Sequence, residues 1–312
     1  MTVELASAQM VHKPWGRVDL HPWNGIDVSS DPVGEVWFER TDKRAPIPAL
    51  LLKLLFTSQP LSIQVHPNDE FAGSIGLPNG KTEAWYVLSA TPGARVALGL
   101  KQPLTPEALR GAIRDGSVAG LAQWCPVVQG DVIFVPGGTI HAIGANIVLA
   151  EIQQRSDTTY RLFDFGRNRE LHEDAAVAAS DSGIATPQPV PRRLTDARTV
   201  LVTSRHFVLE RVDLDPGSNW TLETDRETWI LVIEGDGRIG SAETAVGDAI
   251  FMEADSAGME TGPDGMTILI AYPGPDPIAP LLRDCASHAN GAAGASAVVP
   301  FPESDKIIEV QT

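Results

Sequence analysis

Polar and apolar residues alternate in two stretches of the chain, L-S-I-Q-V-H and K-T-E-A-W-Y-V-L. In the first stretch Ser62, Gln64 and His66 are separated by single apolar residues, so on a β-strand all three point to one face. Lys81 and Glu83 share a face of the second stretch in the same way. Imidazole, amide and carboxylate groups are ligands that divalent metals accept. The pattern predicts a metal site, with a solvated face of an edge strand as the alternative.

The rest of the apolar pattern is mainly that of β-strands, interrupted by one helical insert. Residues 49–56 form an almost unbroken apolar run that predicts a core strand, in which Lys53 either extends to solvent or is buried opposite an acid. Residues 104–124 change to helical spacing. There Thr105 is a suitable N-cap, a proline follows it, and Gly116 ends the helix.

A third polar element follows a tight bend later in the chain. The sequence G-D-V-I-F-V-P-G-G-T-I-H contains a turn, an apolar strand, a Pro-Gly-Gly bend and then His141. This order is typical of the second half of a cupin barrel, a small β-barrel in which ligands carried by strands meet at the mouth. His141 therefore joins Gln64, His66 and Glu83 as a predicted ligand, and four donors suit a nitrogen/oxygen metal site.

A proline-rich connector divides the chain. Residues 181–197 carry three prolines at alternate positions with little apolar content, which predicts an extended linker. We therefore expect an N-terminal catalytic, metal-binding cupin at residues 1–185 and a C-terminal cupin at 186–312. Before the connector, residues 171–179 predict a short helix with His172 on the surface.

The two predicted domains share an internal repeat. The letters E-T-W at residues 227–229 echo E-A-W at 83–85, and G-D-A-I-F-M echoes G-D-V-I-F-V. Eleven residues after the turn glycine the first copy has His141, whereas the second has Gly258. The second copy is thus predicted to be degenerate and free of metal. After Leu281 the chain is rich in Ala, Gly and Ser, which predicts a weakly ordered tail with a last short strand at residues 306–310.

Composition limits the classes of partner. The chain has 24 basic and 40 acidic residues among 312, a net charge of −16, which argues against nucleic acid and anionic membranes as partners. The two cysteines provide no disulfide framework and no cysteine-based zinc spacing, and the N-terminus lacks a signal-peptide pattern. We expect a cytoplasmic protein that needs a local basic pocket if its substrate is an anion.

Four motifs occur in order: Q-V-H-P-N-D, G-K-T-E-A-W-Y, P-G-G-T-I-H-A-I-G and E-I-Q-Q-R-S-D-T-T-Y-R-L-F-D. With them the chain resembles the type I phosphomannose isomerases in their short bacterial form, strongly over about residues 13–169 and more loosely to 272. The resemblance implies a mainly β bicupin enzyme that binds one divalent metal, Zn²⁺, and interconverts mannose 6-phosphate and fructose 6-phosphate through a cis-enediol.

The resemblance also implies roles for single residues. Ser62 and Lys81 match positions that contact the substrate phosphate, and Arg161 matches the catalytic arginine. Glu151 lies ten residues before Arg161, where the family has an acid proposed as the proton-transfer base. Independently of the family, a sugar isomerase needs a base and a group that stabilises the developing oxyanion. Lys81 would supply the charge that a phosphate needs in an acidic protein.

Alternatives remain at this stage for both residues and function. Arg161 would have a structural role if it formed a salt bridge to Asp157 or Asp164, and so would Lys81 if it paired with an acid in the loop before it, such as Asp69 or Glu70. A cupin oxygenase would use a similar ligand set with iron. A cupin that binds a sugar phosphate without turnover is the third hypothesis.

Overall fold

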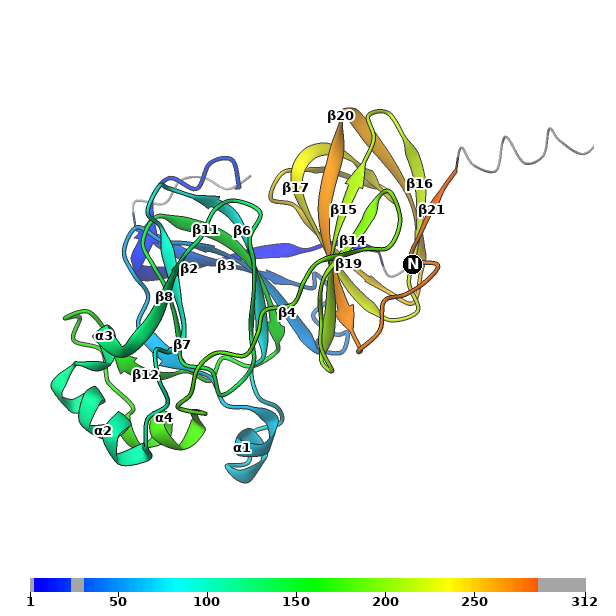
Figure 1. The fold of residues 1–312 in the computed structure, drawn as a ribbon. Helices are drawn as coiled ribbons and strands as arrows, with labels where there is room; N and C mark the ends of the chain where they lie inside the picture. The colour runs from blue at the N-terminus through cyan, green and yellow to red at the C-terminus, as the bar shows by residue number, and fades with distance from the viewer. Residues whose placement is uncertain (1–2, 24–30, 286–312) are drawn as a thin grey trace, which may run out of the picture.

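The computed structural model describes residues 3–23 and 31–285 of the chain. Two β-rich halves lie side by side, and the helices gather at one end of the N-terminal half (Figure 1). The prediction of a mainly β, cupin-type fold with a small helical insert is confirmed. The helices are α1 (Asp69–Ser74), α2 (Pro106–Asp115), α3 (Val118–Leu121) and α4 (Glu173–Ala179).

Two sheets form the N-terminal half. The six-stranded sheet has the order β2 (Ser7–Arg17), β3 (Val33–Glu39), β4 (Leu50–Phe56), β11 (Ile147–Gln154), β6 (Glu83–Ala90) and β9 (Val132–Val135). The five-stranded sheet has the order β12 (Tyr160–Phe163), β5 (Ile63–Val65), β10 (His141–Ile143), β7 (Arg95–Leu100) and β8 (Ala122–Pro126). The predicted polar stretches fall on β5 and β6, although Ser62, His66 and Lys81 lie just outside the strand bounds.

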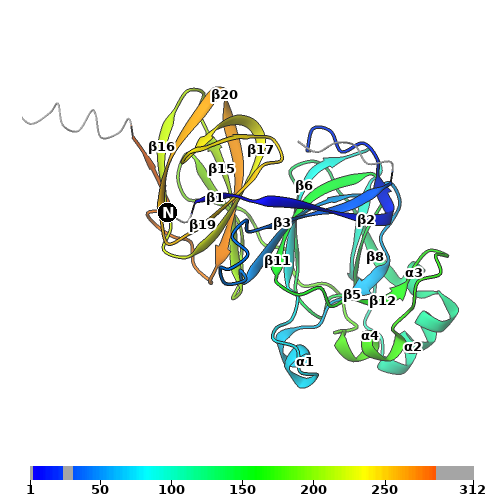
Figure 2. The ribbon, with the colours of Figure 1, turned by 180° about the vertical axis from the view of Figure 1, so that it is seen from behind.

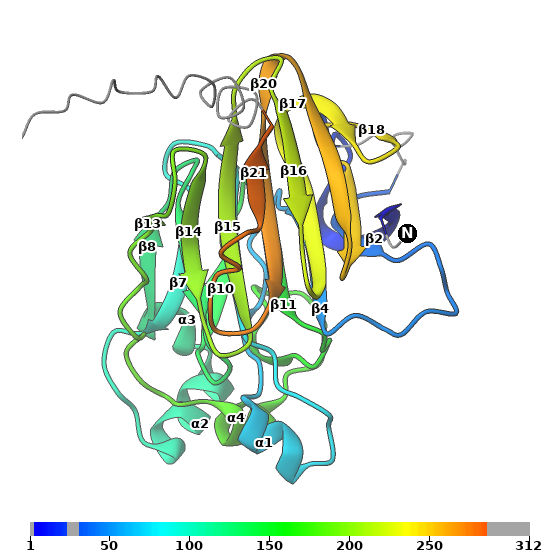
Figure 3. The same cartoon turned by 90° about the vertical axis from the view of Figure 1, so that its right-hand side faces the viewer.

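A ten-stranded sheet makes up most of the C-terminal half. Its main path is β1 (Glu4–Leu5), β19 (Ala249–Glu253), β17 (Glu227–Ile239), β20 (Ser256–Pro273), β15 (Phe207–Leu214), β14 (Arg198–Thr203) and β13 (Arg192–Arg193). Three further strands attach to it, namely β16 (Asn219–Glu223), β18 (Ala242–Ala245) and β21 (Leu282–Asp284). Figure 3 shows β21 against β16, far from the helical end of the molecule.

Strand alternation determines which side chains face the site. In β6 the side chains of Ala84, Tyr86 and Leu88 pack into the core shared with the C-terminal half, whereas Trp85 and Val87 pack into a separate core of the N-terminal half. The same alternation in β4 turns Lys53 away from the shared core, because its neighbours on either side lie in that core. One face of the six-stranded sheet therefore holds the halves together, and the other carries polar groups.

The halves are also joined at the N-terminus. The chain runs from β1, which pairs with β19 of the C-terminal half, directly into β2, which pairs with β3 of the N-terminal half (Figure 2). The shared hydrophobic core includes Leu54 and Tyr86 from one half and Phe207, Trp229 and Phe251 from the other. Residues 4–5 thus belong to the sheet of the C-terminal half, and the boundary at 185/186 stays a prediction.

The helical insert follows the sequence signals closely. Thr105 caps α2 by accepting a hydrogen bond from the Ala108 N–H, and Gly116 ends it with φ +77°, a left-handed conformation that glycine adopts without strain. The insert is shorter than predicted, because residues 122–124 belong to β8. The predicted helix at 171–179 is α4.

One sequence-based expectation concerns the C-terminal tail of the chain. The predicted strand at 306–310 and most of the predicted weakly ordered tail fall outside the described residues, whereas residues 282–284 form β21. Among the described residues, no helix has the length and apolar character needed to span a membrane.

Candidate metal centre and active-site cleft

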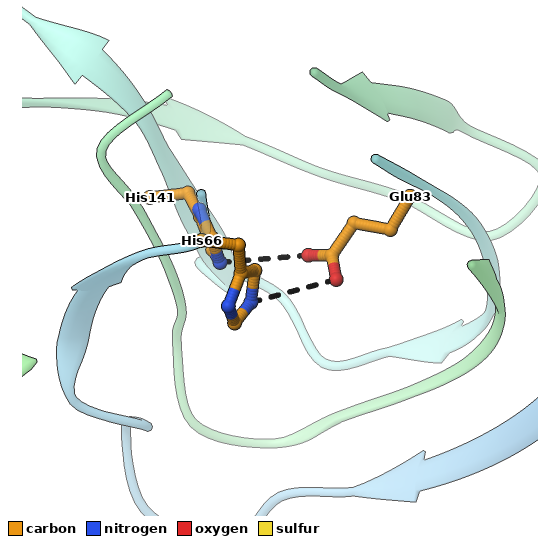
Figure 4. A group of neighbouring side chains, drawn as sticks. All are labelled: His66, Glu83 and His141. Atoms are coloured by element: carbon orange, nitrogen blue, oxygen red, sulfur yellow. Dashed lines mark ion pairs between the residues drawn. The ribbon is translucent and has the colours of Figure 1, made fainter. Parts of the chain in front are cut away.

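Three predicted ligands converge at the inner end of a cleft in the N-terminal half. The side chains of His66, Glu83 and His141 point toward one another, and their ligand atoms all lie within 4.8 Å (Figure 4). The Nε2 atom of His141 is 3.4 Å from Glu83 Oε1, and that of His66 is 3.6 Å from Glu83 Oε2. All three residues are buried. This separation leaves room for an ion between the imidazoles and the carboxylate.

The Pro-Gly-Gly bend brings His141 to this position. A Cβ atom on Gly137 would lie 2.6 Å from the Pro67 carbonyl oxygen, and Gly138 has φ +97°. Only glycine fits both the close approach and the left-handed conformation. The bend packs against the chain beyond His66, so β10 starts at His141 beside β5, where His141 is in register with Gln64.

Hydrogen bonds at the far side of each ring orient both imidazoles. Nδ1 of His66 donates to the Thr158 carbonyl oxygen at 2.8 Å, and Nδ1 of His141 donates to that of Thr139 at 2.9 Å. Each Nε2 lone pair is therefore directed into the cluster, as metal-ligating histidines require. Burial is the larger cause that lowers the pKa of His66, and the nearby Lys81 ammonium is the second. Burial also lowers the pKa of His141, to about 4. Both rings are neutral and ready to bind a metal.

The donor set fits a divalent cation. Oε2 of Glu83 is buried and receives no hydrogen bond of acceptable geometry, although the Lys81 Nζ atom lies 3.0 Å away. A buried carboxylate oxygen without such a partner is costly unless a cation binds there. Two imidazoles and one carboxylate match three-ligand catalytic zinc sites.

Gln64 lies beside the cluster, as predicted. Its Nε2 atom is 3.3 Å from His141 Nε2 and 3.4 Å from His66 Nε2, while its Oε1 atom accepts a hydrogen bond from Ser62. Ligation by Gln64 would require the amide to turn over and direct the oxygen inward. The role of Gln64 as a fourth ligand therefore stays a prediction, whereas its place at the site is clear.

The Lys81 side chain lies at the inner end of the cleft, where it contacts the predicted metal ligands. Its ammonium contacts Glu83 Oε2 at 3.0 Å and His66 Nε2 at 2.9 Å, and the residue is buried. Burial alone would lower the pKa of Lys81, but the Glu83 and Glu151 carboxylates more than offset this and raise it. The alternative in which Lys81 pairs with Asp69 is wrong, because Asp69 instead binds Arg205 and the Gly80 N–H.

Glu151 faces the same cleft from the middle of β11. Its Oε2 atom accepts a hydrogen bond from the Trp85 indole at 3.0 Å, and Oε1 lies 3.6 Å from the Lys53 Nζ atom. Burial, followed by the negative charge of Glu83, raises the pKa of Glu151. A buried carboxylate with a raised pKa suits proton transfer, which the family resemblance assigned to this residue.

A chain of charges continues from Glu151, and the sequence pattern did not predict which residues take part in it. Lys53 Nζ lies 3.6 Å from Glu35 Oε2, and Lys13 Nζ lies 3.4 Å from Glu35 Oε1. Of the two interpretations of Lys53, the buried charge opposite an acid is confirmed, because Lys53 is 3% exposed. The signal was the interruption of an apolar run by a lysine, but its partners lie on other strands and cannot be read from local spacing.

Arg161 lies nearer the mouth of the cleft. Its Nη1 atom donates to the Glu170 carbonyl oxygen at 3.2 Å, and within the described ranges its guanidinium makes no ion pair with Asp157 or Asp164. Asp164 is instead held by Arg167 and Arg169. The salt-bridge alternative for Arg161 is therefore wrong. His172, which was predicted to be a surface residue, also lines the cleft. Its Nδ1 atom accepts a hydrogen bond from the Arg161 N–H at 3.0 Å, which holds the ring beside Arg161.

The cleft has a volume of about 200 Å³ and is open on one side. Of the predicted residues it exposes Ser62, Gln64, Lys81, Glu83, Glu151 and Arg161 along its walls, with the two histidines beneath. Residues in its lining that the sequence analysis did not assign to a site include Lys13, Glu35, Lys53, Thr159, Arg169 and His172.

The C-terminal half repeats the turn of the N-terminal half. Its strand residues, however, correspond one position away from the match between the letters E-A-W and E-T-W. The Val87 N–H donates to the Asp131 carbonyl oxygen, and the Val232 N–H donates in the same way to Asp248, so these two positions correspond. Counting back along the strands, the position of Glu83 is taken by Thr228, not by Glu227. The side chain of Glu227 instead accepts hydrogen bonds from the N–H groups of Ala49 and Leu50.

Known proteins similar to the chain are named as mannose-6-phosphate isomerases. No protein-family model matches the chain. It is 35% identical over 241 residues to the mannose-6-phosphate isomerase of Streptococcus mutans, an alignment that covers 71% of this chain and 75% of that protein. It is 37% identical over 213 residues to mannose-6-phosphate isomerase ManA of Bacillus subtilis, covering 62% of this chain and 64% of the relative.

Solved structures agree in fold. The mannose 6-phosphate isomerase of Bacillus subtilis matches with a TM-score of 0.76 and 24% identity, over 87% of this chain and all of that chain (100%). A variant of phosphomannose isomerase from Salmonella typhimurium matches with a TM-score of 0.67 and 15% identity, over 88% of this chain and 100% of its own. Given the identity to the streptococcal enzyme over three quarters of its length, the chain belongs to the mannose-6-phosphate isomerase family.

Proposed function

We propose that this chain interconverts mannose 6-phosphate and fructose 6-phosphate, in keeping with its family. The observation that carries the proposal is the convergence of a metal-ligand cluster, a buried carboxylate and an arginine on one cleft. Neither a cupin oxygenase nor a binding protein without turnover is favoured by the relatives, which are named as isomerases.

The reaction moves one proton from C2 to C1 of the open-chain sugar and a second between the two oxygens. We assign the carbon proton to Glu151, whose carboxylate takes it from C2 and returns it to C1 of the cis-enediol. Its raised pKa favours both halves of this transfer, because a base must also release the proton as an acid. Lys53 and the Trp85 indole hold the carboxylate in place during the transfer.

We assign the metal to His66, Glu83 and His141, with Gln64 as the fourth ligand. When bound, a divalent cation supplies positive charge that stabilises the oxygen at which negative charge develops. We propose Zn²⁺, because two imidazoles and a carboxylate form one of its common catalytic ligand sets. Ser62 and Lys81 contact the substrate at this end of the cleft, where the buried ammonium of Lys81 provides a hydrogen-bond donor beside the metal ligands.

Arg161 is the last of the proposed active-site residues, and it lies nearer the mouth of the cleft than the others. Its guanidinium has a backbone carbonyl and no carboxylate as its hydrogen-bonding partner in the described part of the chain, so its remaining N–H groups are available to the substrate. A guanidinium aimed at developing negative charge stabilises the transition state by electrostatics.

We further propose that the residues for catalysis come from 1–185, with 186–312 as a metal-free partner half. We place the enzyme in the cytoplasm, the reducing compartment that suits its two exposed free cysteines, Cys125 and Cys285.

Turnover of mannose 6-phosphate by the purified chain, with and without a chelator, tests the function. We expect turnover that the chelator abolishes and that Zn²⁺ restores, with metal analysis of the protein as isolated to identify the ion. Turnover that persists in the metal-free protein would contradict the assigned role of the cluster, and absence of turnover in metal-loaded protein would contradict the function.

A further inference from the structure

The mouth of the cleft carries positive charge of its own, separate from Lys81 at the inner end. Arg161, Arg169 and His172 all contribute to its lining. The side chains of Arg161 and Arg169 are close enough for the second to lower the pKa of the first, after burial as the larger cause. The carboxylates of Asp164 and Glu170 offset part of this repulsion. The positive charge that remains on this wall favours binding of an anion.

A single buried acid arranges these groups. Asp164 is 3% exposed and binds Arg169 through two bonds, one of them from Nε to Oδ2 at 2.8 Å. It also binds Arg167, whose Nη2 atom lies 2.9 Å from Asp164 Oδ1 and 2.9 Å from the Pro60 carbonyl oxygen. Burial alone would raise the pKa of Asp164, but the hydrogen bonds from Arg169 and Arg167 hold it below its usual range. Asp164 is thus ionised and fixes the direction of Arg169.

His172 is fixed just as firmly. Its Nδ1 atom accepts the Arg161 N–H, while its own backbone N–H donates to the Arg161 carbonyl oxygen at 2.8 Å. Because Nδ1 is the acceptor, the neutral ring carries its proton on Nε2. His172 therefore presents an N–H donor beside the two guanidinium groups.

We propose that Arg169 and His172 bind the phosphate group of the substrate at the mouth of the cleft, beside Arg161, and that Asp164 positions Arg169. The proposal rests on the function proposed above and names the residues that select a phosphorylated sugar. A guanidinium fork and an imidazole N–H provide the charge and the directed donors that a phosphate dianion needs. Lys81 is less suited to this task, because its ammonium already contacts Glu83 and His66.

The arrangement provides a matched control. Arg167 and Arg169 carry the same charge and bind the same carboxylate, but of the two only Arg169 is part of the cleft lining. Replacing either with glutamine removes one positive charge at nearly the same place. The difference between the two variants therefore isolates direct contact with the phosphate from long-range electrostatics.

The experiment measures inhibition by inorganic phosphate and kinetics with mannose 6-phosphate on metal-loaded protein. For Arg169→Gln we expect KM and the inhibition constant for phosphate to rise about tenfold or more, the loss typical of a hydrogen bond to a charged group. His172→Phe should raise both by a smaller factor. Arg167→Gln should leave both within about twofold of wild type, even if its melting temperature falls.

Equal changes in Arg167→Gln and Arg169→Gln would overturn the proposal, as would a Lys81→Met variant that loses phosphate binding while Arg169→Gln keeps it. Binding of inorganic phosphate, followed by calorimetry, provides a reading that does not depend on turnover. If the wild type fails to isomerise mannose 6-phosphate yet binds phosphate through Arg169, the function is wrong and the anion site stands. If turnover is normal in Arg169→Gln, the anion site is wrong and the function stands.

Discussion

Corresponding strands of the two halves carry different groups. In the N-terminal half they carry the proposed active site, and in the C-terminal half they carry a network of polar groups that bind one another. In the first, Glu151 is in register with Lys53 on one side and Trp85 on the other. In the second, Ile270 occupies the corresponding place, between Glu210 and Ile230. The position of Glu151 is thus apolar in the C-terminal half, and the position of Lys53 is an acid.

The acid of the C-terminal half is fully paired. Glu210 is buried and accepts two hydrogen bonds from Arg198, at 2.9 and 2.8 Å, and one from the Tyr272 hydroxyl. Arg198 in turn donates to the carbonyl oxygens of Ile278 and Ala279. Both carboxylate oxygens of Glu210 thus have donors within the protein, which adds specificity to the fold. In the N-terminal half Glu83 Oε2 is left without a hydrogen bond, and that difference separates a binding site from a structural network.

The largest effect should come from the ligand that the C-terminal half lacks. The variant His141→Ala removes an imidazole from the cluster, and Gly258 holds that place in the repeat. We expect about one ion per chain in the wild type, none in the variant, and a fall in turnover of roughly a thousandfold, since the metal contributes several kcal/mol. Metal analysis by mass spectrometry with a parallel assay measures both. Two ions per chain, or full occupancy in the variant, would contradict a metal-free C-terminal half.

The next effect concerns Arg161, for which ion pairing is excluded among the described residues. The variant Arg161→Ala should keep its metal and its melting temperature but lose about a hundredfold in kcat, the usual effect of removing a group that stabilises transition-state charge. Steady-state kinetics and thermal unfolding decide the matter. A large fall in melting temperature with kcat near wild type would show that Arg161 is structural after all.

The corresponding test in the C-terminal half is a variant of Glu210, in the paired network with Arg198. Replacing Glu210 with glutamine leaves the buried guanidinium of Arg198 without its charged partner, which typically costs about 3–5 kcal/mol of unfolding free energy. We expect that loss in urea denaturation, together with unchanged metal content and an unchanged kcat per folded molecule. If kcat fell while stability held, the C-terminal half would take part in catalysis, and the comparison would fail.

Much of the site could be predicted from the sequence because its ligands occur in local patterns. Alternation places Ser62, Gln64 and His66 together, and the Pro-Gly-Gly bend marks His141. The buried pairs Lys53–Glu151 and Lys53–Glu35 could not be predicted in this way, because each joins strands that are neighbours only in the folded sheet. His172 was missed for a similar reason, since its partner Arg161 lies on a strand before the loop.

The repeat shows a second limit. Matching the letters E-T-W to E-A-W equates Glu227 with Glu83, whereas the strand pairing equates Thr228 with Glu83. A shift of one residue in a strand reverses which side chains face inward. Trp229 accordingly packs into the core shared by the two halves, while Trp85 packs inside the N-terminal half. Sequence letters alone do not contain this information, because the two strands start at different points relative to their turns.

The smallest expected effect tests this offset directly. Glu227 accepts hydrogen bonds from the Ala49 N–H at 2.6 Å and the Leu50 N–H at 2.9 Å, so it joins β17 to the start of β4 in the other half. The variant Glu227→Ala should lower the unfolding free energy by about 1–3 kcal/mol, the range for hydrogen bonds to a charged group. Metal content and kcat should not change, because the side chain points away from the interior of the C-terminal half.

The matched variant Thr228→Val lies at the true counterpart of Glu83 and loses only the hydroxyl contacts with Thr224 and the Arg226 carbonyl. It should cost about 1 kcal/mol, again with no change in metal. Urea denaturation of both variants, with metal analysis alongside, makes the test. Loss of metal in Glu227→Ala would mean that Glu227 is a second ligand site after all, and the two halves would then be alike in chemistry as well as in fold.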